Sequence, residues 1–305
     1  MGSRRSFLRS WSSPLSLFVV VVALAASSAD GFKAPRVPCY FIFGDSLYDS
    51  GNNNNLNTSV KVNYSPYGID FPAGPTGRFS NGRTAADIIG ETLGFKDFIP
   101  PFASNPDDRQ ILVGVNYASG SAGILVESGK QGGDNVDLNK QLRNHKVTVS
   151  RIVKKLGSKK AAFEHLARKV ALAGISNIGC TPSLIATVGT NGAPCVTSVN
   201  QLVAPFNIGL KSLISQLKSA HPDAKFGYLD TINAFKCFFF LSVFAAFKVK
   251  TTPCCQVSTV TGLCLPNTVP CSQRRSYLFW DAFHPTELAN RLGAPILFPV
   301  IQRIL

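Results

Sequence analysis

The feature that most constrains the fold is a short apolar run near the start of the chain that stops at a glycine and two polar residues. The run Tyr40–Phe43 gives way to Gly44-Asp45-Ser46, and a stretch rich in glycine and asparagine follows. Short apolar runs bounded by turn residues are typical of buried strands. Ligands of open parallel sheets bind just beyond the carboxyl ends of the strands, where Ser46 falls. Ser46 is therefore a candidate nucleophile, although a serine at such a position more often only caps a helix.

Further apolar runs and helical patterns follow along the chain, which at 305 residues is long enough for one large α/β domain or two small ones. We expect strands over 111–123, 167–176 and 225–229. A helix capped by Thr84 and a basic helical segment over 137–166 are expected as well. An amphipathic helix is expected over 200–220, with an apolar face made of Leu202, Phe206, Leu210, Leu213, Ile214 and Leu217.

The N-terminus has the layout of a secretory signal peptide. Arg4, Arg5 and Arg9 precede an apolar stretch over 15–26, and small residues lead up to Ala29. This order of a basic leader, a short apolar segment and a small-residue exit is typical of a cleaved leader, whereas a membrane span needs about 20 apolar residues. We therefore expect cleavage after Ala29, a single secreted domain over 30–305, and no stable membrane span.

The cysteines and two asparagines agree with an extracellular destination. The chain has eight cysteines, a number that suits an oxidising compartment. Four of them lie between Cys254 and Cys271 in a loop without nearby histidines, which favours disulfides over a zinc site and leaves the pairing open. Asn57 and Asn63 each begin an Asn-x-Ser/Thr sequence, so both are candidate glycosylation sites.

The net charge of +14 raises the question of a nucleic acid partner. The lysines and arginines are scattered, and no zinc-finger, recognition-module or basic-helix pattern accompanies them. We therefore expect no nucleic acid partner and interpret the charge as suited to an acidic polysaccharide or an anionic surface. His145 and His165 stand in the basic segment without partners in the sequence, and we expect both at the surface.

A second polar pair lies near the end of the chain, in YLFWDAFHPTELANRL. Asp281 precedes His284 by three residues, and Pro285 suits the first position of a helix that Glu287 supports. A carboxylate and an imidazole so spaced can lie side by side, the carboxylate holding the tautomer while the imidazole takes a proton from a serine. Alone, the pair is equally compatible with a metal site or a loop contact. No HExxH, P-loop or GxSxG motif offers another chemistry.

Taken together, FIFGDSLYDSGNNN, GVNYASGSAGI and WDAFHPTE resemble the plant GDSL-motif esterase/lipase branch of the SGNH hydrolases. PTGRFSNGRT, the GCTP turn and the cysteine-rich loop resemble the same branch, so the resemblance spans nearly the whole mature chain. It implies an α/β fold, namely a flavodoxin-like three-layer α/β/α sandwich with a parallel sheet.

The resemblance also implies roles for the residues found above. Ser46 would be the nucleophile, His284 the general base and acid, and Asp281 the carboxylate that orients it. The backbone N–H groups of Ser46 and of the Gly120 stretch would form part of the oxyanion hole. The partner would be an ester substrate, such as a lipid, a cutin-like polyester or an acylated sugar, hydrolysed by a monomer without cofactor or metal.

Two departures from the family pattern stand out. The family has a strand ending in Gly-x-Asn-Asp, whose asparagine completes the oxyanion hole, but here AAFEHL runs directly into ARKVAL, at the join between Leu166 and Ala167. We interpret this as a missing segment that includes one central strand. A phenylalanine-rich segment, 235–247, also replaces a more polar passage. The alternative function is therefore an impaired or inactive relative that binds cell-wall or lipid ligands.

Overall fold

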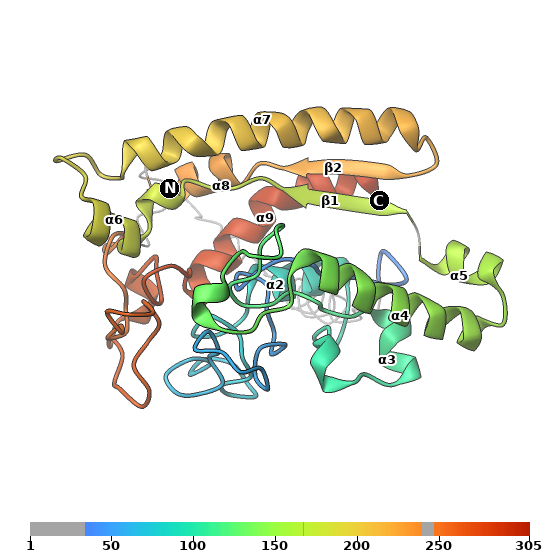
Figure 1. Ribbon diagram of the computed structural model, residues 1–305, viewed down its shortest axis with the longest axis horizontal. Helices are drawn as coiled ribbons and strands as arrows, with labels where there is room; N and C mark the ends of the chain where they lie inside the picture. Colours follow the sequence, from blue (N-terminus) through green and yellow to red (C-terminus); the bar gives the residue numbers. More distant parts are fainter. Residues whose placement is uncertain (1–33, 167, 240–246) are drawn as a thin grey trace, which may run out of the picture. The chain divides into compact units, whose positions relative to one another are not determined.

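The computed structural model describes residues 34–166, 168–239 and 247–305 (Figure 1). The chain divides into two units, Met1–Ala34 and Pro35–Leu305, and the described residues belong almost entirely to the second. The expected signal peptide over 1–29 lies outside the described residues and stays a prediction. Half of the phenylalanine-rich segment, 240–246, lies outside them as well.

Two of the expected strands form a parallel pair. β1 (Lys169–Ala173) and β2 (Lys225–Leu229) run in the same direction, with Lys169 opposite Lys225 and Ala173 opposite Leu229. Parallel strands need a crossover connection, which here contains the long helix α7 (Thr197–Ala220) (Figure 1). The fold is therefore of the α/β class, as predicted.

Alternate residues of β2 face different helices, because successive side chains of a strand point to opposite faces. Gly227 faces α9 (Glu287–Ile304), where an added Cβ would lie 3.0 Å from Val300. Tyr228 faces α7, and the Nζ atom of Lys211 lies 4.7 Å from the centre of its ring. A helix thus covers each face of β2, which is the layering that an α/β/α sandwich requires.

The first expected strand belongs to a second parallel set. Residues 40–44 run beside 113–119: the N–H of Ile42 donates to Val115 O at 3.1 Å, and the N–H of Tyr117 donates to Ile42 O at 2.8 Å. The other edge of 113–119 bonds to residues 100–102. The strand expected over 111–123 therefore starts later than predicted. Its first residues belong to helix α3 (Asp108–Val113), which a capping box of Asp107 and Gln110 starts.

The two parallel sets are not joined by backbone hydrogen bonds in the part of the chain that the structure describes. β1 pairs only with β2, and its outer edge has no strand beside it among the described residues. The prediction that residues 167–176 form a buried strand is right about the strand and wrong about its burial, since Val170 is 39% exposed. Both observations agree with the prediction that one central strand is missing between residues 40–44 and β1.

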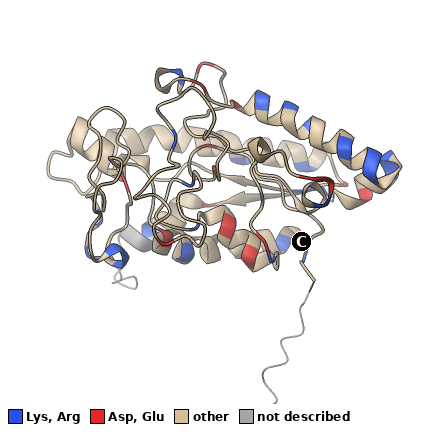
Figure 2. Cartoon of the chain, turned by 90° about the horizontal axis from the view of Figure 1, so that it is seen from below, with Lys and Arg blue, Asp and Glu red and all other residues tan. Residues whose placement is uncertain are grey.

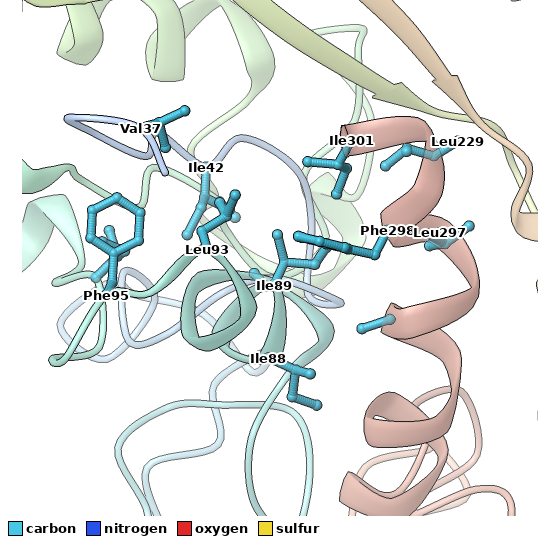
Figure 3. Packing of buried hydrophobic residues seen from close by; sticks show 14 of the residues in the cluster. Val37, Ile42, Ile88, Ile89, Leu93, Phe95, Leu229, Leu297, Phe298 and Ile301 are labelled. Carbon is cyan, nitrogen blue, oxygen red and sulfur yellow. The ribbon is translucent and has the colours of Figure 1, made fainter. Parts of the chain in front are cut away.

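A shared core nevertheless connects the two sets (Figure 3). Ile42 from the first set and Leu229 from β2 belong to one cluster, together with residues of α2 (Ala85–Leu93) and α9. The expected start of α2 is confirmed, because Thr84 and Asp87 form a capping box. The labelled members of this cluster are Val37, Ile42, Ile88, Ile89, Leu93, Phe95, Leu229, Leu297, Phe298 and Ile301.

Two helical predictions need correction. The segment expected over 137–166 is divided into α4 (Leu138–Leu156) and α5 (Lys159–His165), because Gly157 adopts a φ of 79° and Ser158 caps a new helix. In α7 the predicted apolar face is wrong for Leu202, Phe206 and Leu213, which are exposed, and right for Ile214, which is buried. Leu202 is 75% exposed, and the buried residues are Val203, Asn207 and Ile214.

The buried Asn207 explains why the inner face of α7 differs from the predicted one. Its side chain accepts the N–H of Ile175 and donates to the carbonyl of Ile175, both at 2.8 Å. An asparagine that satisfies both backbone groups of a loop residue can be buried at little cost. This contact places a polar residue on the inner face, which a pattern of apolar residues alone does not reveal.

The remaining elements are short. The helices are α6 (Pro182–Val188) and α8 (Thr231–Phe239), and the 3₁₀ turns are η1 (Phe102–Ser104), η2 (Lys130–Gly132), η3 (Ile178–Cys180) and η5 (Arg274–Ser276). The expected disulfides are confirmed: Cys180–Cys195, Cys254–Cys271 and Cys255–Cys264. Cys39 is a free thiol.

The two histidines of the basic segment are half-buried and have contacts, whereas we expected them to lie at the surface without partners. His145 packs against Phe41, Phe43 and Tyr117, and burial lowers its pKa. His165 Nε2 lies 2.8 Å from Leu112 O. The lysines and arginines of α4 and α5 are exposed, apart from the half-buried Arg151, and Figure 2 colours the positions of all lysines and arginines blue. Among the described helices, none combines the length and the apolar character needed to cross a membrane.

Candidate active site

Ser46 lies in a turn at the carboxyl end of the first strand. The carbonyl of Asp45 accepts the N–H groups of Tyr48 and Asp49, at 3.2 and 3.1 Å, and no helix begins here, so Ser46 does not cap one. The Asp45 side chain accepts the N–H of Leu47 at 3.0 Å. Burial raises the pKa of Asp45, while that hydrogen bond and the proximity of His284 act in the opposite direction. Ser46 itself is half-buried.

Asp281 and His284 lie side by side, and His284 reaches Ser46. The Nδ1 atom of His284 is 2.9 Å from Asp281 Oδ1 and 2.8 Å from Asp281 Oδ2. Its Nε2 atom lies 2.7 Å from Ser46 Oγ. A carboxylate at Nδ1 requires the proton there, which leaves Nε2 free to accept the serine proton. The structure thus brings together the three residues singled out in the sequence.

The loop that carries Asp281 and His284 is held by the backbone. Asp281 Oδ1 accepts the N–H groups of Phe283 and His284, both at 2.8 Å. The carbonyl of His284 accepts the N–H of Trp280 at 2.7 Å. The helix that follows, α9, is capped by Thr286 and begins at Glu287, so Pro285 precedes the cap and does not occupy the first helical position. With Asp281 0% and His284 4% exposed, the pair is shielded from water.

The backbone of Gly120 is held in place by two side chains. Its N–H donates to Asp49 Oδ2 at 2.9 Å, and its carbonyl accepts from Asn53 Nδ2 at 3.0 Å. An added Cβ would lie 2.7 Å from both Asn53 and Phe79, so only glycine fits. The Gly120 N–H is therefore engaged, whereas the Ser46 N–H has no hydrogen-bond partner among the described residues.

Asp49 was not singled out in the sequence, although it organises the loops around Ser46. Besides the Gly120 N–H, its carboxylate accepts the N–H groups of Gly51 and Asn52, both at 2.7 Å. Burial raises the pKa of Asp49 to about 6, against the lowering effect of these backbone donors. No spacing pattern in the sequence distinguishes Asp49 from a solvated loop aspartate.

A tyrosine also touches the Asp281–His284 pair. The hydroxyl of Tyr67 donates to Asp281 Oδ2 at 2.7 Å, and Phe79 lies against the His284 ring with 4.9 Å between ring centres. Neither aromatic residue carried a signal in the sequence beyond its apolar character. Together they form one wall of the site.

The two candidate glycosylation asparagines lie elsewhere. Asn57 and Asn63 are both exposed, in the loop between Ser46 and Tyr67. In the described residues there is no group of three or more His, Cys, Asp or Glu side chains that could hold a metal ion.

Comparison with known proteins agrees with this geometry. Residues 134–295 match the family model described as GDSL-like Lipase/Acylhydrolase. The chain is also similar to GDSL esterase/lipases of Arabidopsis thaliana. One is 39% identical over 326 residues, which cover 92% of each chain. Another is 38% identical over 341 residues, which cover 93% of this chain and 92% of the relative.

The first of these alignments has more positions than there are residues of this chain in it. Because 92% of 305 residues is about 281 residues, an alignment over 326 positions includes about 45 positions at which this chain has no residue. Positions without a counterpart in this chain are what the predicted missing segment requires. The alignment thus agrees with the unpaired edge of β1 and with the abrupt join after Leu166.

Proposed function

The chain belongs to the GDSL-like lipase/acylhydrolase family, a family of ester-hydrolysing enzymes, and on this premise we propose that it cleaves carboxylic esters through an acyl-enzyme on Ser46. The observation that carries the proposal is the 2.7 Å contact between His284 Nε2 and Ser46 Oγ, with Asp281 on the other side of the imidazole. A serine becomes a nucleophile at neutral pH when a base accepts its proton.

In the first half-reaction Ser46 Oγ attacks the ester carbonyl carbon and its proton passes to His284 Nε2. The tetrahedral intermediate collapses, the bond to the alcohol oxygen breaks, and the alcohol leaves with the proton that His284 held. In the second half-reaction water attacks the acyl group, His284 takes one of its protons and returns it to Ser46 Oγ, and the carboxylic acid departs. Asp281 keeps the imidazole oriented and stabilises its positive charge throughout.

The site has few hydrogen-bond donors for the oxyanion of the tetrahedral intermediate. We propose that the Ser46 N–H donates to it, with Gly120 as a second donor that first has to leave Asp49. The asparagine that completes the hole in the family has no counterpart in this chain. Loss of one such donor typically costs about a hundred- to a thousandfold in rate, or roughly 2.7–4 kcal/mol.

The substrate and the location follow from the same premise. We propose that the protein is secreted after removal of 1–29, acts outside the cell as a monomer, and carries glycans on the exposed Asn57 and Asn63. Three disulfides agree with an oxidising compartment. The substrate class we propose comprises esters of lipids, cutin-like polyesters and acylated wall sugars.

A p-nitrophenyl ester assay tests the proposal on the full mature chain, with Ser46→Ala as the comparison. We expect measurable release of p-nitrophenol by the natural chain and none above background by the variant. Equal rates in the two proteins would contradict an enzymatic role.

Two observations favour a second function: among the described residues no strand lies on the outer edge of β1, and the Gly120 N–H is already bonded to Asp49. In this alternative the protein binds cell-wall or lipid ligands without hydrolysing them. Under that alternative, natural chain and Ser46→Ala bind an ester-containing ligand with equal affinity and neither hydrolyses it.

A further inference from the structure

Tyr67 lies between the catalytic carboxylate and a loop closed by a disulfide. Its hydroxyl donates to Asp281 Oδ2 at 2.7 Å and accepts the backbone N–H of Cys264 at 3.0 Å. Cys264 is bonded to Cys255, nine residues earlier in the sequence. The tyrosine side chain is 1% exposed. One buried hydroxyl thus links the loop between Cys255 and Cys264 to the catalytic pair.

We propose that Tyr67 is a positioning residue that holds the Asp281 carboxylate in the orientation His284 needs. The proposal rests on the proposed function, because it assigns Tyr67 a role in the same reaction. Tyr67 does not touch the serine, and it acts through Asp281.

The hydrogen bonds of Asp281 show why its second oxygen needs support. Within the described residues, Oδ1 accepts two backbone N–H groups, from Phe283 and His284, in addition to the imidazole. Oδ2 accepts only from His284 Nδ1 and the Tyr67 hydroxyl. Without that hydroxyl, a buried charged oxygen would lose a donor, which is costly in a water-free site. We therefore expect the carboxylate to rotate away from the orientation that places it against His284 Nδ1.

The direction of this hydrogen bond is fixed by charge. Burial and the neighbouring Asp281 carboxylate raise the pKa of Tyr67 well above its ordinary value, so the phenol keeps its proton and donates it. The ring is held from two sides, by Tyr64 with 5.5 Å between ring centres and by Phe79 with 6.3 Å. The hydroxyl is thus held in place by packing before substrate binds.

The chain supplies a matched control. The hydroxyl of Tyr64 donates to the carbonyl of Cys264 at 2.8 Å, so the two tyrosines bond to the two backbone groups of one residue. Only Tyr67 also bonds to Asp281. Tyr64→Phe and Tyr67→Phe therefore each remove one hydroxyl that is bonded to the backbone of Cys264, but only the second removes a donor from the Asp281 carboxylate.

The experiment compares the natural chain, Tyr67→Phe and Tyr64→Phe in an ester assay corrected for the Ser46→Ala background. We expect Tyr67→Phe to lower kcat about ten- to a hundredfold with KM nearly unchanged, and to alter the pH dependence of kcat, because a misplaced catalytic group reduces rate rather than binding. Tyr64→Phe should keep the natural kcat. A kcat for Tyr67→Phe equal to that of the natural chain, or an equal decrease in both variants, would overturn the proposal.

A second measurement does not depend on turnover and separates this proposal from the proposed function. If no Ser46-dependent hydrolysis is found, the proposed function fails, and the ¹H NMR resonance of the hydrogen-bonded His284 Nδ1–H, assigned by its loss in His284→Ala, tests Tyr67. We expect this resonance to shift or vanish in Tyr67→Phe and to stay in place in Tyr64→Phe. An unchanged resonance in Tyr67→Phe would contradict the positioning role.

Discussion

The carboxylate of Asp49 holds the backbone N–H of Gly120 at a distance of 2.9 Å, beside the strand that ends at Ser46. The residue expected to supply an oxyanion donor is therefore bonded to a buried acid. Since burial raises the pKa of Asp49 to about 6, this contact responds to moderately acidic pH. The hydrogen bonding of the Gly120 N–H therefore depends on the charge of Asp49, which takes no part in the proposed chemistry.

The first prediction concerns the stability contributed by Asp49. Its folded pKa of about 6 lies above the ordinary value of about 3.9, so the folded state binds the proton more tightly. Relative to Asp49→Asn, whose side chain stays neutral, the natural chain should then lose roughly 2 kcal/mol of stability as pH rises from about 4 to above 6, at about 1.36 kcal/mol per pKa unit. Urea unfolding of the natural chain and Asp49→Asn between pH 4 and 7 measures this. A stability difference between the two proteins that stays constant over that range would contradict the prediction.

The second prediction concerns the catalytic pair. In the proposed mechanism Ser46 and His284 act as a unit, so Ser46→Ala, His284→Ala and the double variant should have the same residual rate, at least about a thousandfold below the natural chain. Initial rates with a p-nitrophenyl ester measure this. If the double variant were much slower than either single variant, the two residues would act independently.

The third prediction concerns a buried ion pair outside the site. Arg78 is 5% exposed, bonds Asp87 through two nitrogens at 2.8 Å each, and stacks on Phe71. Arg78→Ala should destabilise the protein by about 3–5 kcal/mol, because it leaves the Asp87 charge buried and unpaired.

The control for that prediction is Arg274, whose pairing with Asp70 has the same two-nitrogen geometry on partly exposed side chains. Arg274→Ala should cost no more than about 1 kcal/mol. Urea unfolding at constant pH measures both variants, and equal losses would show that burial does not decide the strength of these pairs.

The fourth prediction concerns the segment that this chain lacks. Insertion between Leu166 and Ala167 of the corresponding Gly-x-Asn-Asp segment of an Arabidopsis relative should raise kcat about a hundred- to a thousandfold, because it restores one oxyanion donor. It should also stabilise the protein, since the open edge of β1 would gain a partner. A folded chimera with an unchanged kcat would mean that the missing asparagine is not what limits the rate.

Much of the architecture could be predicted from local patterns. The strand at Tyr40–Phe43, the cap at Thr84 and the strand over 225–229 are found where the apolar runs and turn residues indicate. The errors arose where a polar contact overrides hydrophobic periodicity. Asp107 caps helix α3, whose last three residues lie in an expected strand, and Asn207 lies on the buried face of α7, where we expected apolar residues.

Local patterns along the chain single out the candidate residues, Ser46 after a strand and Asp281 and His284 three residues apart, and they predict a missing segment after Leu166. It takes the folded chain to show that Ser46 Oγ contacts His284 although 238 residues separate them in the sequence, that Tyr67 bonds to Asp281, and that Asp49 accepts the Gly120 N–H. The physical reason is the range of the interactions. Strand and cap signals are local and repeat along the chain, whereas a hydrogen bond between distant residues depends on which loops the packed core brings together.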